Sequence, residues 1–330
     1  MAPLKKSNLG SPAGGSNKEL GKSSKTTKSS FRPLTSNPVL SSPLPPSSKL
    51  LVIVGPTASG KSKLALQLAE RYNGEIICAD SRTVYTGMDI GTAKPTKTEQ
   101  ALVRHHLLDV VNPNQIFSAA DFQKQANSII DDIHKRNRLP ILVGGSGLYI
   151  DGVIFNFKFQ PAVEPAERVR LSSMSIEQLQ AEITAKGYMM PENSLNPRYL
   201  MRTIERKGVV EERGELRPNT LVIGLSPDIK VLKGRIIKRI RQMVDAGLVE
   251  ETRELLLKYG VDAPGLLSTS YKAMIQHVKG NIELDQAIEQ FATNDLHFAK
   301  RQKSWFKRNP HIKWVNDEAT AQQIVMQFLQ

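Results

Sequence analysis

The sequence has almost no cysteine, and Cys78 is the only one in 330 residues. A single cysteine excludes an internal disulfide and any zinc site built from several cysteines, and it fits a reducing compartment. Long apolar runs are also missing, since no stretch of about 18 apolar residues occurs that would cross a membrane. The content of 40% hydrophobic and 23% charged residues is ordinary for a globular protein.

Acidic residues are scarce relative to basic ones, with 32 Asp and Glu against 45 Lys and Arg, which gives a net charge of +13. The first 50 residues hold eight Lys or Arg and a single acid, Glu19, and the rest of the chain is still basic. A basic folded part suits a polyanionic partner such as a nucleic acid. A basic, solvated surface without a partner explains the charge equally well.

Residues 1–48 have few large apolar side chains and are rich in Ser, Pro, Lys and Gly. Such a segment cannot bury enough surface to offset the entropy of ordering it, so we predict a disordered basic tail. Its many hydroxyls and few acids also resemble an organelle transit peptide. We expect a cytoplasmic protein, with organelle import through the tail, or weak RNA affinity of the tail, as open alternatives.

A glycine-rich turn from Gly55 to Ser62 organises the rest of the chain. It follows the apolar run Leu50–Val54 and precedes a helical pattern. Strand, glycine-rich turn and helix are the context of a phosphate-binding P-loop, in which backbone N–H groups and the helix dipole face one anion. Lys61 would then reach the terminal phosphate oxygens, and the Ser62 hydroxyl would complete a Mg²⁺ shell.

Further apolar runs predict buried strands at residues 75–79, 139–143 and 220–224. Between the first two runs, Ser118 and Asp121 predict a capping box that opens a helix through about Arg136. Strands that alternate with helices indicate a parallel sheet covered on both faces. The sequence therefore predicts an α/β fold, a P-loop NTPase-like parallel sheet flanked by helices.

The stretch 154–218 differs from its surroundings, because prolines break it into short helical pieces. We predict a small helical insertion domain there. It would interrupt a P-loop catalytic domain formed by residues 49–153 and 219–330, of which the part after residue 225 is expected to be helical.

Asp80 follows the second predicted strand, at the edge where open α/β sheets bind ligands. It has a structural interpretation, as a helix cap or a residue near Mg²⁺, and a functional one, as a carboxylate that accepts a proton from a nucleophile. Phosphate-transfer enzymes usually end a neighbouring strand in a Mg²⁺-binding acid, whereas the third strand here ends in Gly144-Gly145. The segment Ser81–Pro95 is predicted to be an ordered, functional loop.

Ser226 is predicted as the N-cap of a helix that begins at Pro227. This helix places Arg235 and Arg239 one turn apart on the same face. Two such arginines either face solvent or clamp a diphosphate through bidentate contacts. His105-His106 has no third ligand at a suitable spacing, so no metal site is expected there.

Several blocks, in their order and spacing from about residue 50 to 315, resemble one family, the tRNA dimethylallyltransferases (tRNA isopentenyltransferases). The blocks are Gly55–Ser62, Ala79–Tyr85, Gly87–Pro95, His105–Asp109, Ser118–Phe122, Leu142–Tyr149, Ala299–Gln302 and Trp305-Phe306. The Gly87–Pro95 block is very specific. The sequence departs from the common family pattern at Thr83, Asn196, Ser270 and Ala273.

The resemblance implies transfer of a dimethylallyl group from dimethylallyl diphosphate to N6 of the position-37 adenosine, 3′-adjacent to the anticodon, in tRNAs reading codons that begin with U. The products are N6-isopentenyladenosine and diphosphate. Asp80 and Arg239 match the family's catalytic carboxylate and diphosphate-contacting arginine, and Mg²⁺ at Ser62 is the implied cofactor. The implied partners are the tRNA anticodon stem-loop and dimethylallyl diphosphate, with no membrane and a monomeric protein.

The resemblance also implies two sets of binding residues. The diphosphate-binding set is Gly55, Thr57, Ala58, Ser59, Gly60, Lys61, Ser62 and Arg235. The tRNA-binding set is Ser81, Arg82, Thr83, Ser146, Arg198, Tyr199, Leu200, Met201, Arg202, Ser270, Tyr271 and Lys272. The insertion would be a lid that closes on the anticodon stem.

Three alternatives stay open at this point. An adenylate isopentenyltransferase would use free AMP, ADP or ATP as acceptor, although the Gly91–Pro95 block and the basic insertion favour tRNA. A small-molecule P-loop kinase would transfer phosphate instead of a prenyl group. A non-catalytic RNA-binding protein would keep the fold without turnover.

Overall fold

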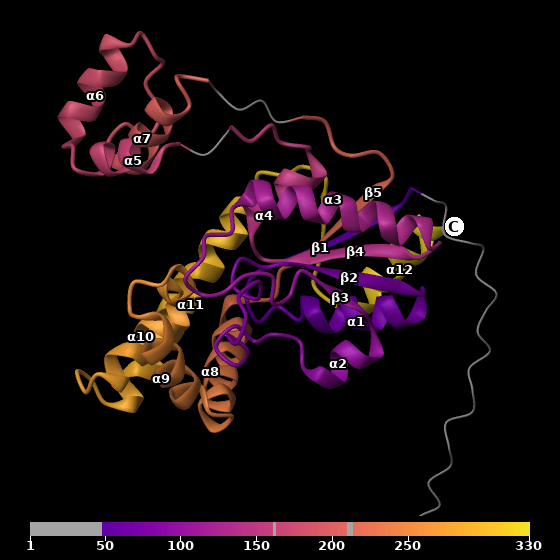
Figure 1. Cartoon of the computed structure of the whole chain (residues 1–330). Coiled ribbons are helices and arrows are strands. Elements are labelled where there is room, and N and C mark those ends of the chain that lie inside the picture. Colours follow the sequence, from indigo (N-terminus) through magenta and orange to yellow (C-terminus); the bar gives the residue numbers. More distant parts are fainter. Residues whose placement is uncertain (1–47, 161–162, 210–213) are drawn as a thin grey trace, which may run out of the picture. The chain divides into compact units, whose positions relative to one another are not determined.

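The computed structural model describes residues 48–160, 163–209 and 214–330 (Figure 1). The tail predicted at residues 1–48 therefore lies outside the described residues, except for Ser48. No helix in the described ranges is long and apolar enough to cross a membrane.

The described residues form a six-stranded sheet in the order β3-β2-β4-β1-β5-β6, in which every pair of neighbours is parallel. The strands are β1 (Leu50–Val54), β2 (Gly74–Ala79), β3 (His105–His106), β4 (Leu139–Gly144), β5 (Thr220–Leu225) and β6 (Ile312–Val315). The four strands predicted from apolar runs are confirmed as β1, β2, β4 and β5. The predicted fold class, an α/β fold with a P-loop-like parallel sheet, is confirmed with them.

Helices cover both faces of this sheet. The helices of the described residues are α1 (Lys61–Arg71), α2 (Lys97–Leu102), α3 (Ala119–Lys135), α4 (Gly147–Ile154), α5 (Pro165–Ser172), α6 (Ile176–Ala185), α7 (Pro197–Glu205), α8 (Ile229–Asp245), α9 (Leu248–Tyr259), the 3₁₀ helix η1 (Pro264–Leu267), α10 (Thr269–Val278), α11 (Leu284–Phe306) and α12 (Glu318–Leu329). Leu51 and Ile53 share a core with α1 and α12, whereas Val52 and Val54 share one with α3 and α4. This alternation follows from the strand geometry, because successive side chains point to opposite faces.

The edge formed by the carboxyl ends of the central strands positions the candidate site. Val54 of β1 and Ala79 of β2 both pair with Gly144 of β4. The three strands therefore end together, and the loops that follow them meet at one edge of the sheet. A Cβ on Gly144 would lie 1.9 Å from the carbonyl oxygen of Ala79, so only glycine fits between β2 and β4 at this point.

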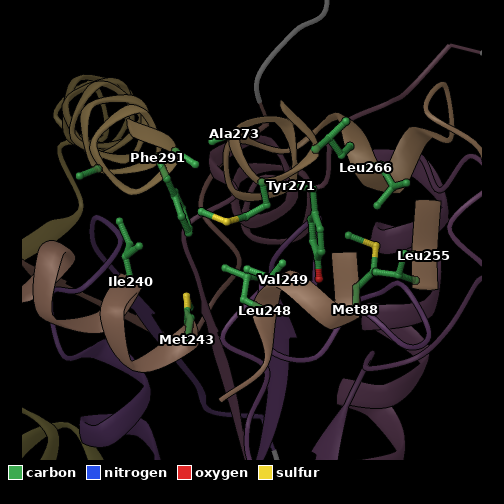
Figure 2. Close-up of a cluster of buried hydrophobic side chains, with 14 of the residues drawn as sticks. Met88, Ile240, Met243, Leu248, Val249, Leu255, Leu266, Tyr271, Ala273 and Phe291 are labelled. Carbon is green, nitrogen blue, oxygen red and sulfur yellow. The ribbon is translucent and has the colours of Figure 1, made fainter. Parts of the chain in front are cut away.

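A third core joins helices α8, α9, α10 and α11 (Figure 2). Its buried side chains include Ile240 of α8, Leu248 of α9, Tyr271 of α10 and Phe291 of α11. Met88, from the loop after β2, is fully buried in the same core. This packing fixes the segment 81–95 as the ordered loop that was predicted.

Helices α5, α6 and α7 lie within the stretch predicted as an insertion and share a small core of their own. Leu171, Leu179, Ile183, Leu200 and Ile204 form this core. Three helices of eight to ten residues each can bury few apolar side chains, so this core is small. A separate insertion domain that acts as a lid stays a prediction.

Several local predictions need correction. The helix that carries Arg235 and Arg239 begins at Ile229, and its N-cap is Asp228, whose carboxylate accepts the Lys230 N–H at 2.7 Å. The predicted cap, Ser226, lies just beyond the end of β5. The chain after residue 225 is also not wholly helical, because Ile312–Val315 forms β6 at the sheet edge.

Candidate active site

The Gly55–Ser62 loop folds as the sequence predicts. Gly55 has φ +156°, and a Cβ there would lie 2.8 Å from the carbonyl oxygen of Leu225. Gly60 has φ +97° and caps α1 in the left-handed region, which glycine adopts without the steric cost of a side chain. The loop therefore curls tightly at the N-terminus of α1, whose first N–H groups have no partner within the helix.

Lys61 begins α1 and lines the cavity at this edge of the sheet. Its Nζ donates to the carbonyl oxygen of Pro56 at 3.3 Å. Burial lowers the pKa of Lys61 to about 8, with a smaller lowering from the Arg239 cation and opposing contributions from Asp80 and Asp295. An anion bound beside Lys61 would restore its charge.

Arg239 reaches the same loop from α8. Its Nη2 donates to Thr57 Oγ1 at 2.7 Å and to Asp295 Oδ2 at 2.8 Å. The other carboxylate oxygen of Asp295 accepts the Thr269 hydroxyl at 2.9 Å. Burial raises the pKa of Asp295, while the Arg239 cation opposes that rise. One turn before Arg239, Arg235 Nη1 contacts the carbonyl oxygen of Ser59 at 3.4 Å.

Asp80 stands directly after β2 in a tight turn. Its Oδ1 accepts the Arg82 N–H at 2.8 Å, which fixes the orientation of the carboxylate. The neighbouring Ser81 N–H donates to Ser146 Oγ at 2.9 Å. The loops after β2 and β4 are therefore tied together next to Asp80.

These groups converge on one cavity of about 110 Å³. Its polar lining includes Thr57, Lys61, Ser62, Asp80, Thr83, Arg239 and Gln302, and its apolar lining includes Ala65, Ile76, Cys78, Val143 and Phe298. Burial raises the pKa of the Cys78 thiol to about 12, so this side chain is a neutral part of the wall. Two cations, a carboxylate and an apolar wall can hold a phosphate group beside a hydrocarbon group.

The donor set of the cavity fits Mg²⁺ rather than zinc. In the described ranges, no group of three or more His, Cys, Asp or Glu is arranged to hold a metal. Ser62 and Asp80 both line the cavity, and Mg²⁺ typically takes one or two protein oxygens plus phosphate and water. His106 Nε2 lies 2.7 Å from the buried carboxylate of Glu75.

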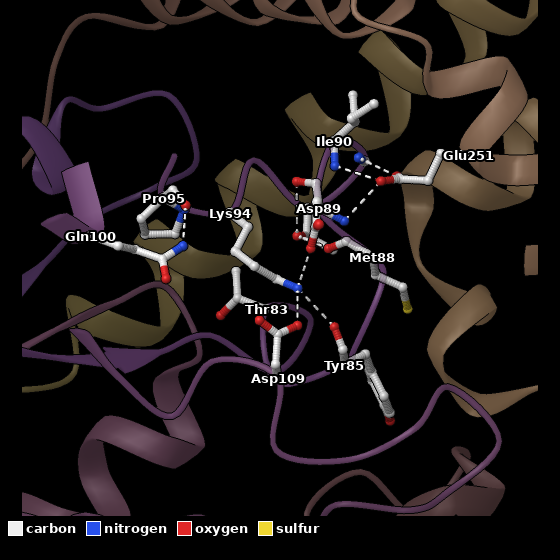
Figure 3. A network of polar contacts seen from close by, with 12 residues as sticks. Thr83, Tyr85, Met88, Asp89, Ile90, Lys94, Pro95, Gln100, Asp109 and Glu251 are labelled. Carbon is white, nitrogen blue, oxygen red and sulfur yellow. Dashed lines mark hydrogen bonds and ion pairs between the residues drawn. The ribbon is translucent and has the colours of Figure 1, made fainter. Parts of the chain in front are cut away.

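The loop after Asp80 is held by two groups of polar contacts, one around Lys94 and one around Glu251 (Figure 3). The side chain of Lys94 is only 3% exposed, and its Nζ lies 2.5 Å from Asp89 Oδ1 and 2.6 Å from Asp109 Oδ1. The carboxylate of Glu251 on α9 accepts the N–H groups of residues 89, 90 and 91. The part of the loop from Asp89 to Lys94 is thus anchored at both ends.

The residues predicted to bind tRNA fall in several places. Ser81, Arg82, Thr83 and Ser146 lie beside Asp80 at the sheet edge. Lys272 is exposed, but Ser270 is 4% and Tyr271 0% exposed, and the Tyr271 hydroxyl donates to Glu251 at 2.6 Å. This burial opposes a direct RNA contact by Tyr271 and gives its side chain a role in holding the loop.

In the insertion, the predicted tRNA-binding residues differ in solvent exposure along α7. Arg198, Tyr199 and Arg202 are exposed, and Tyr199 is 49% exposed. Leu200 is fully buried in the core of α5 to α7, so its side chain cannot contact RNA in this conformation. Their roles in binding stay predictions.

Sequence reasoning assigned no role to Asp295, Glu251 or Gln302. Gln302 belongs to the block Ala299–Gln302, which matches the family pattern, so that block could have pointed to a functional role for Gln302. Asp295 and Glu251 lie on amphipathic helices, where a buried carboxylate cannot be told from a solvated one without the fold.

Comparisons with known proteins identify the family of the chain. The model of the family described as IPP transferase matches residues 83–309. The tRNA dimethylallyltransferase of Oceanobacillus iheyensis is 36% identical over 285 residues, which cover 82% of this chain and 91% of that protein. The corresponding protein of Thermoanaerobacter sp. is 39% identical over 286 residues, covering 81% and 91%.

Solved structures give the same result. The tRNA isopentenylpyrophosphate transferase of Bacillus halodurans has a TM-score of 0.67 at 35% identity, covering 86% of this chain and 97% of that one. A eukaryotic dimethylallyltransferase acting on tRNA has a TM-score of 0.70 at 24% identity, covering 82% and 74%, and shows the shared fold. The resemblance found in the motifs is therefore confirmed, and the chain belongs to the IPP transferase family.

Proposed function

We propose that the protein transfers a dimethylallyl group from dimethylallyl diphosphate to N6 of the position-37 adenosine, 3′-adjacent to the anticodon, in tRNAs reading codons that begin with U. Membership of the IPP transferase family supports this proposal, as do the relatives named tRNA dimethylallyltransferase. The observation that supports it most is that Lys61, Asp80 and Arg239 line one cavity together with apolar side chains.

The Gly55–Ser62 loop is the cradle for the diphosphate. Backbone N–H groups at the start of α1 and the cations of Lys61 and Arg239 neutralise the charge that grows on the leaving oxygen as the carbon–oxygen bond breaks. Arg235 supports the loop from one turn earlier on α8. The dimethylallyl group lies against apolar side chains such as Val143 and Phe298, where it is shielded from water.

Asp80 acts on the acceptor. The adenine N6 attacks C1 of the dimethylallyl group, the bond from C1 to the diphosphate oxygen breaks, and N6 loses one proton to the Asp80 carboxylate. The products are N6-isopentenyladenosine and diphosphate. A well-placed general base contributes about 10²–10⁴ in rate, and the hydrogen bond from Arg82 N–H at 2.8 Å holds this carboxylate in place.

Mg²⁺ is the proposed cofactor, and the Ser62 hydroxyl, with Asp80 lining the same cavity, would hold it. When bound, it supplies positive charge that stabilises the departing diphosphate. Ser62 is well suited to this because it stands in the first turn of α1 and lines the cavity.

The proposed macromolecular partner is tRNA. A base in a folded anticodon loop must leave its stack to enter a cavity of this size. The basic chain, with a net charge of +13, favours such a polyanion. Exposed residues of α7 and Lys272 are the proposed contacts away from the cavity.

Labelled dimethylallyl diphosphate, incubated with unmodified tRNA or with AMP, tests the proposal. Label should appear in the tRNA and be lost when adenosine 37 is replaced by guanosine. Label in AMP but not in tRNA would make the protein an adenylate isopentenyltransferase. Phosphate release from ATP without prenyl transfer would make it a kinase or ATPase, and either outcome refutes the proposal.

A further inference from the structure

Gln302 on α11 joins the two halves of the candidate site. Its side-chain Oε1 accepts the Thr57 N–H at 2.9 Å, and its Nε2 donates to the carbonyl oxygen of Gly145 at 3.0 Å. Gln302 is only 5% exposed, and its hydrogen bond to Gly145 is buried, whereas the one to Thr57 is partly buried. One amide thus connects the loop after β1 with the loop after β4.

Both of these loops carry groups that the reaction needs. Thr57 opens the anion-binding loop, and its hydroxyl accepts a hydrogen bond from Arg239. Gly145 precedes Ser146, whose hydroxyl accepts the N–H of Ser81 next to Asp80. One hydrogen-bonded route from the leaving-group cradle to the carboxylate therefore runs through the amide of Gln302.

The chemistry of this bridge is specific for glutamine. It needs an acceptor on one side and a donor on the other, which a carboxamide supplies. Glutamate would lose the donor and add a negative charge beside the diphosphate, and leucine would leave a buried N–H and a buried C=O unpaired. Position 145, which accepts the hydrogen bond from Gln302, favours glycine, because a Cβ there would lie 2.1 Å from Gln302 Nε2.

The bridge also changes how the loop can bind an anion. The Thr57 N–H points at Gln302, so it is not available to a diphosphate. The anion-binding N–H groups must come from later in the loop and from the first turn of α1. Gln302 thus affects the position of the diphosphate-binding loop more than the affinity of this loop for the diphosphate.

We propose that Gln302 is a positioning residue that sets the distance between the diphosphate cradle and Asp80. This inference rests on the proposed prenyl transfer. A displacement of about 1 Å between reacting groups can cost about 10²-fold in rate. Loss of the bridge should therefore lower kcat while leaving the binding of each substrate nearly intact.

The test compares Gln302→Ala with Gln290→Leu, an exposed glutamine on the same helix that serves as the control. Gln302→Ala should lower kcat for prenyl transfer by about 10- to 100-fold. The KM for dimethylallyl diphosphate and the Kd for tRNA should stay within threefold of wild type. Gln290→Leu should match wild type in all three.

A double-mutant cycle separates positioning from general loss of structure. Gly145→Ala alone should lower kcat, because its Cβ displaces Gln302 Nε2. In the Gln302→Ala background the next neighbour of that Cβ is the carbonyl oxygen of Gly55 at 3.6 Å, an ordinary contact. Gly145→Ala should then add no further loss, and the two effects should be strongly non-additive.

Three results would overturn the inference. Turnover of Gln302→Ala within twofold of wild type would remove Gln302 from the reaction. A large rise in KM with unchanged kcat, or additive losses in the cycle, would make it only a support for the loop. If wild type and Gln290→Leu both transfer no label, the proposed function itself fails, which is a distinct outcome.

Discussion

Binding of dimethylallyl diphosphate should weaken steeply between pH 7 and pH 9, because Lys61 loses its proton in that interval. Burial lowers its pKa to about 8. The anion favours the charged lysine, so the pKa rises in the complex and binding takes up a proton wherever the free site has lost it. Affinity is therefore nearly full at pH 7 and falls as the pH rises through about 8.

The magnitude follows from that pKa. A lysine with a pKa of about 8 is about nine-tenths charged at pH 7 and about one-tenth charged at pH 9. The affinity should fall about tenfold over this range, or about 1.4 kcal/mol. The terminal phosphate of the ligand titrates near pH 6 and stays constant here. Cys78, with a pKa raised to about 12, also stays neutral.

Calorimetric titration without tRNA measures both quantities. In two buffers of different ionisation enthalpy, the uptake should be about 0.1 proton at pH 7 and about 0.9 at pH 9. Lys61→Arg is the matched control, because an arginine keeps its charge throughout, so its affinity should not change with pH. A wild-type affinity that is constant from pH 7 to pH 9, or an equal fall in Lys61→Arg, would refute the reasoning.

Three further predictions concern the carboxylates around the site. Asp80→Asn should lower kcat by about 10² or more with an unchanged Kd for tRNA, because only proton transfer is lost; equal turnover would remove Asp80 from the mechanism. The side chain of Asp295→Asn can still accept a hydrogen bond from Arg239 and donate one to Thr269, but its negative charge is lost. Inhibition by product diphosphate should therefore become about tenfold tighter. Weaker inhibition would contradict this prediction. Glu251→Gln should lower the free energy of unfolding in urea by about 3 kcal/mol, since a charged acceptor of several hydrogen bonds is lost. Tyr271→Phe should lower it by about 1 kcal/mol, because a single hydrogen bond is lost. Equal losses of unfolding free energy in the two variants would refute this prediction.

Much of the sheet could be predicted because its strands carry strong local signals. The runs that became β1, β4 and β5 are apolar at nearly every position, as parallel strands buried on both faces must be. The capping box of Ser118 and Asp121 is confirmed at the start of α3. Local chemistry alone decides these elements.

The missed elements are those whose pairing is decided at long range. β3 is only His105–His106, too short and too polar to carry a periodic signal. β6 buries only its first and last residues, and its strand conformation depends on pairing with β5. By contrast, Thr96 and Glu99 form a capping box at the start of α2, a signal that the sequence carries.

The candidate site likewise has residues that the sequence predicts and residues that only the fold reveals. The Gly55–Ser62 loop and Asp80 could be located because they follow predicted strands. Asp295 and Gln302 reach the site from a helix more than two hundred residues further along the chain. Only the assembled fold brings them to the loop, so sequence spacing says nothing of their partners.

The pairing of β1 has a consequence for synthesis of the chain. Its neighbours are β4 and β5, and Leu50 pairs with Thr220, about 170 residues later. At roughly 5–20 residues per second, the ribosome needs roughly 10–30 s to deliver that second neighbour. During this time a wholly apolar strand with an open edge waits on the nascent chain, which is a template for wrong pairing. Chaperone demand during translation should therefore end only when residue 225 has emerged.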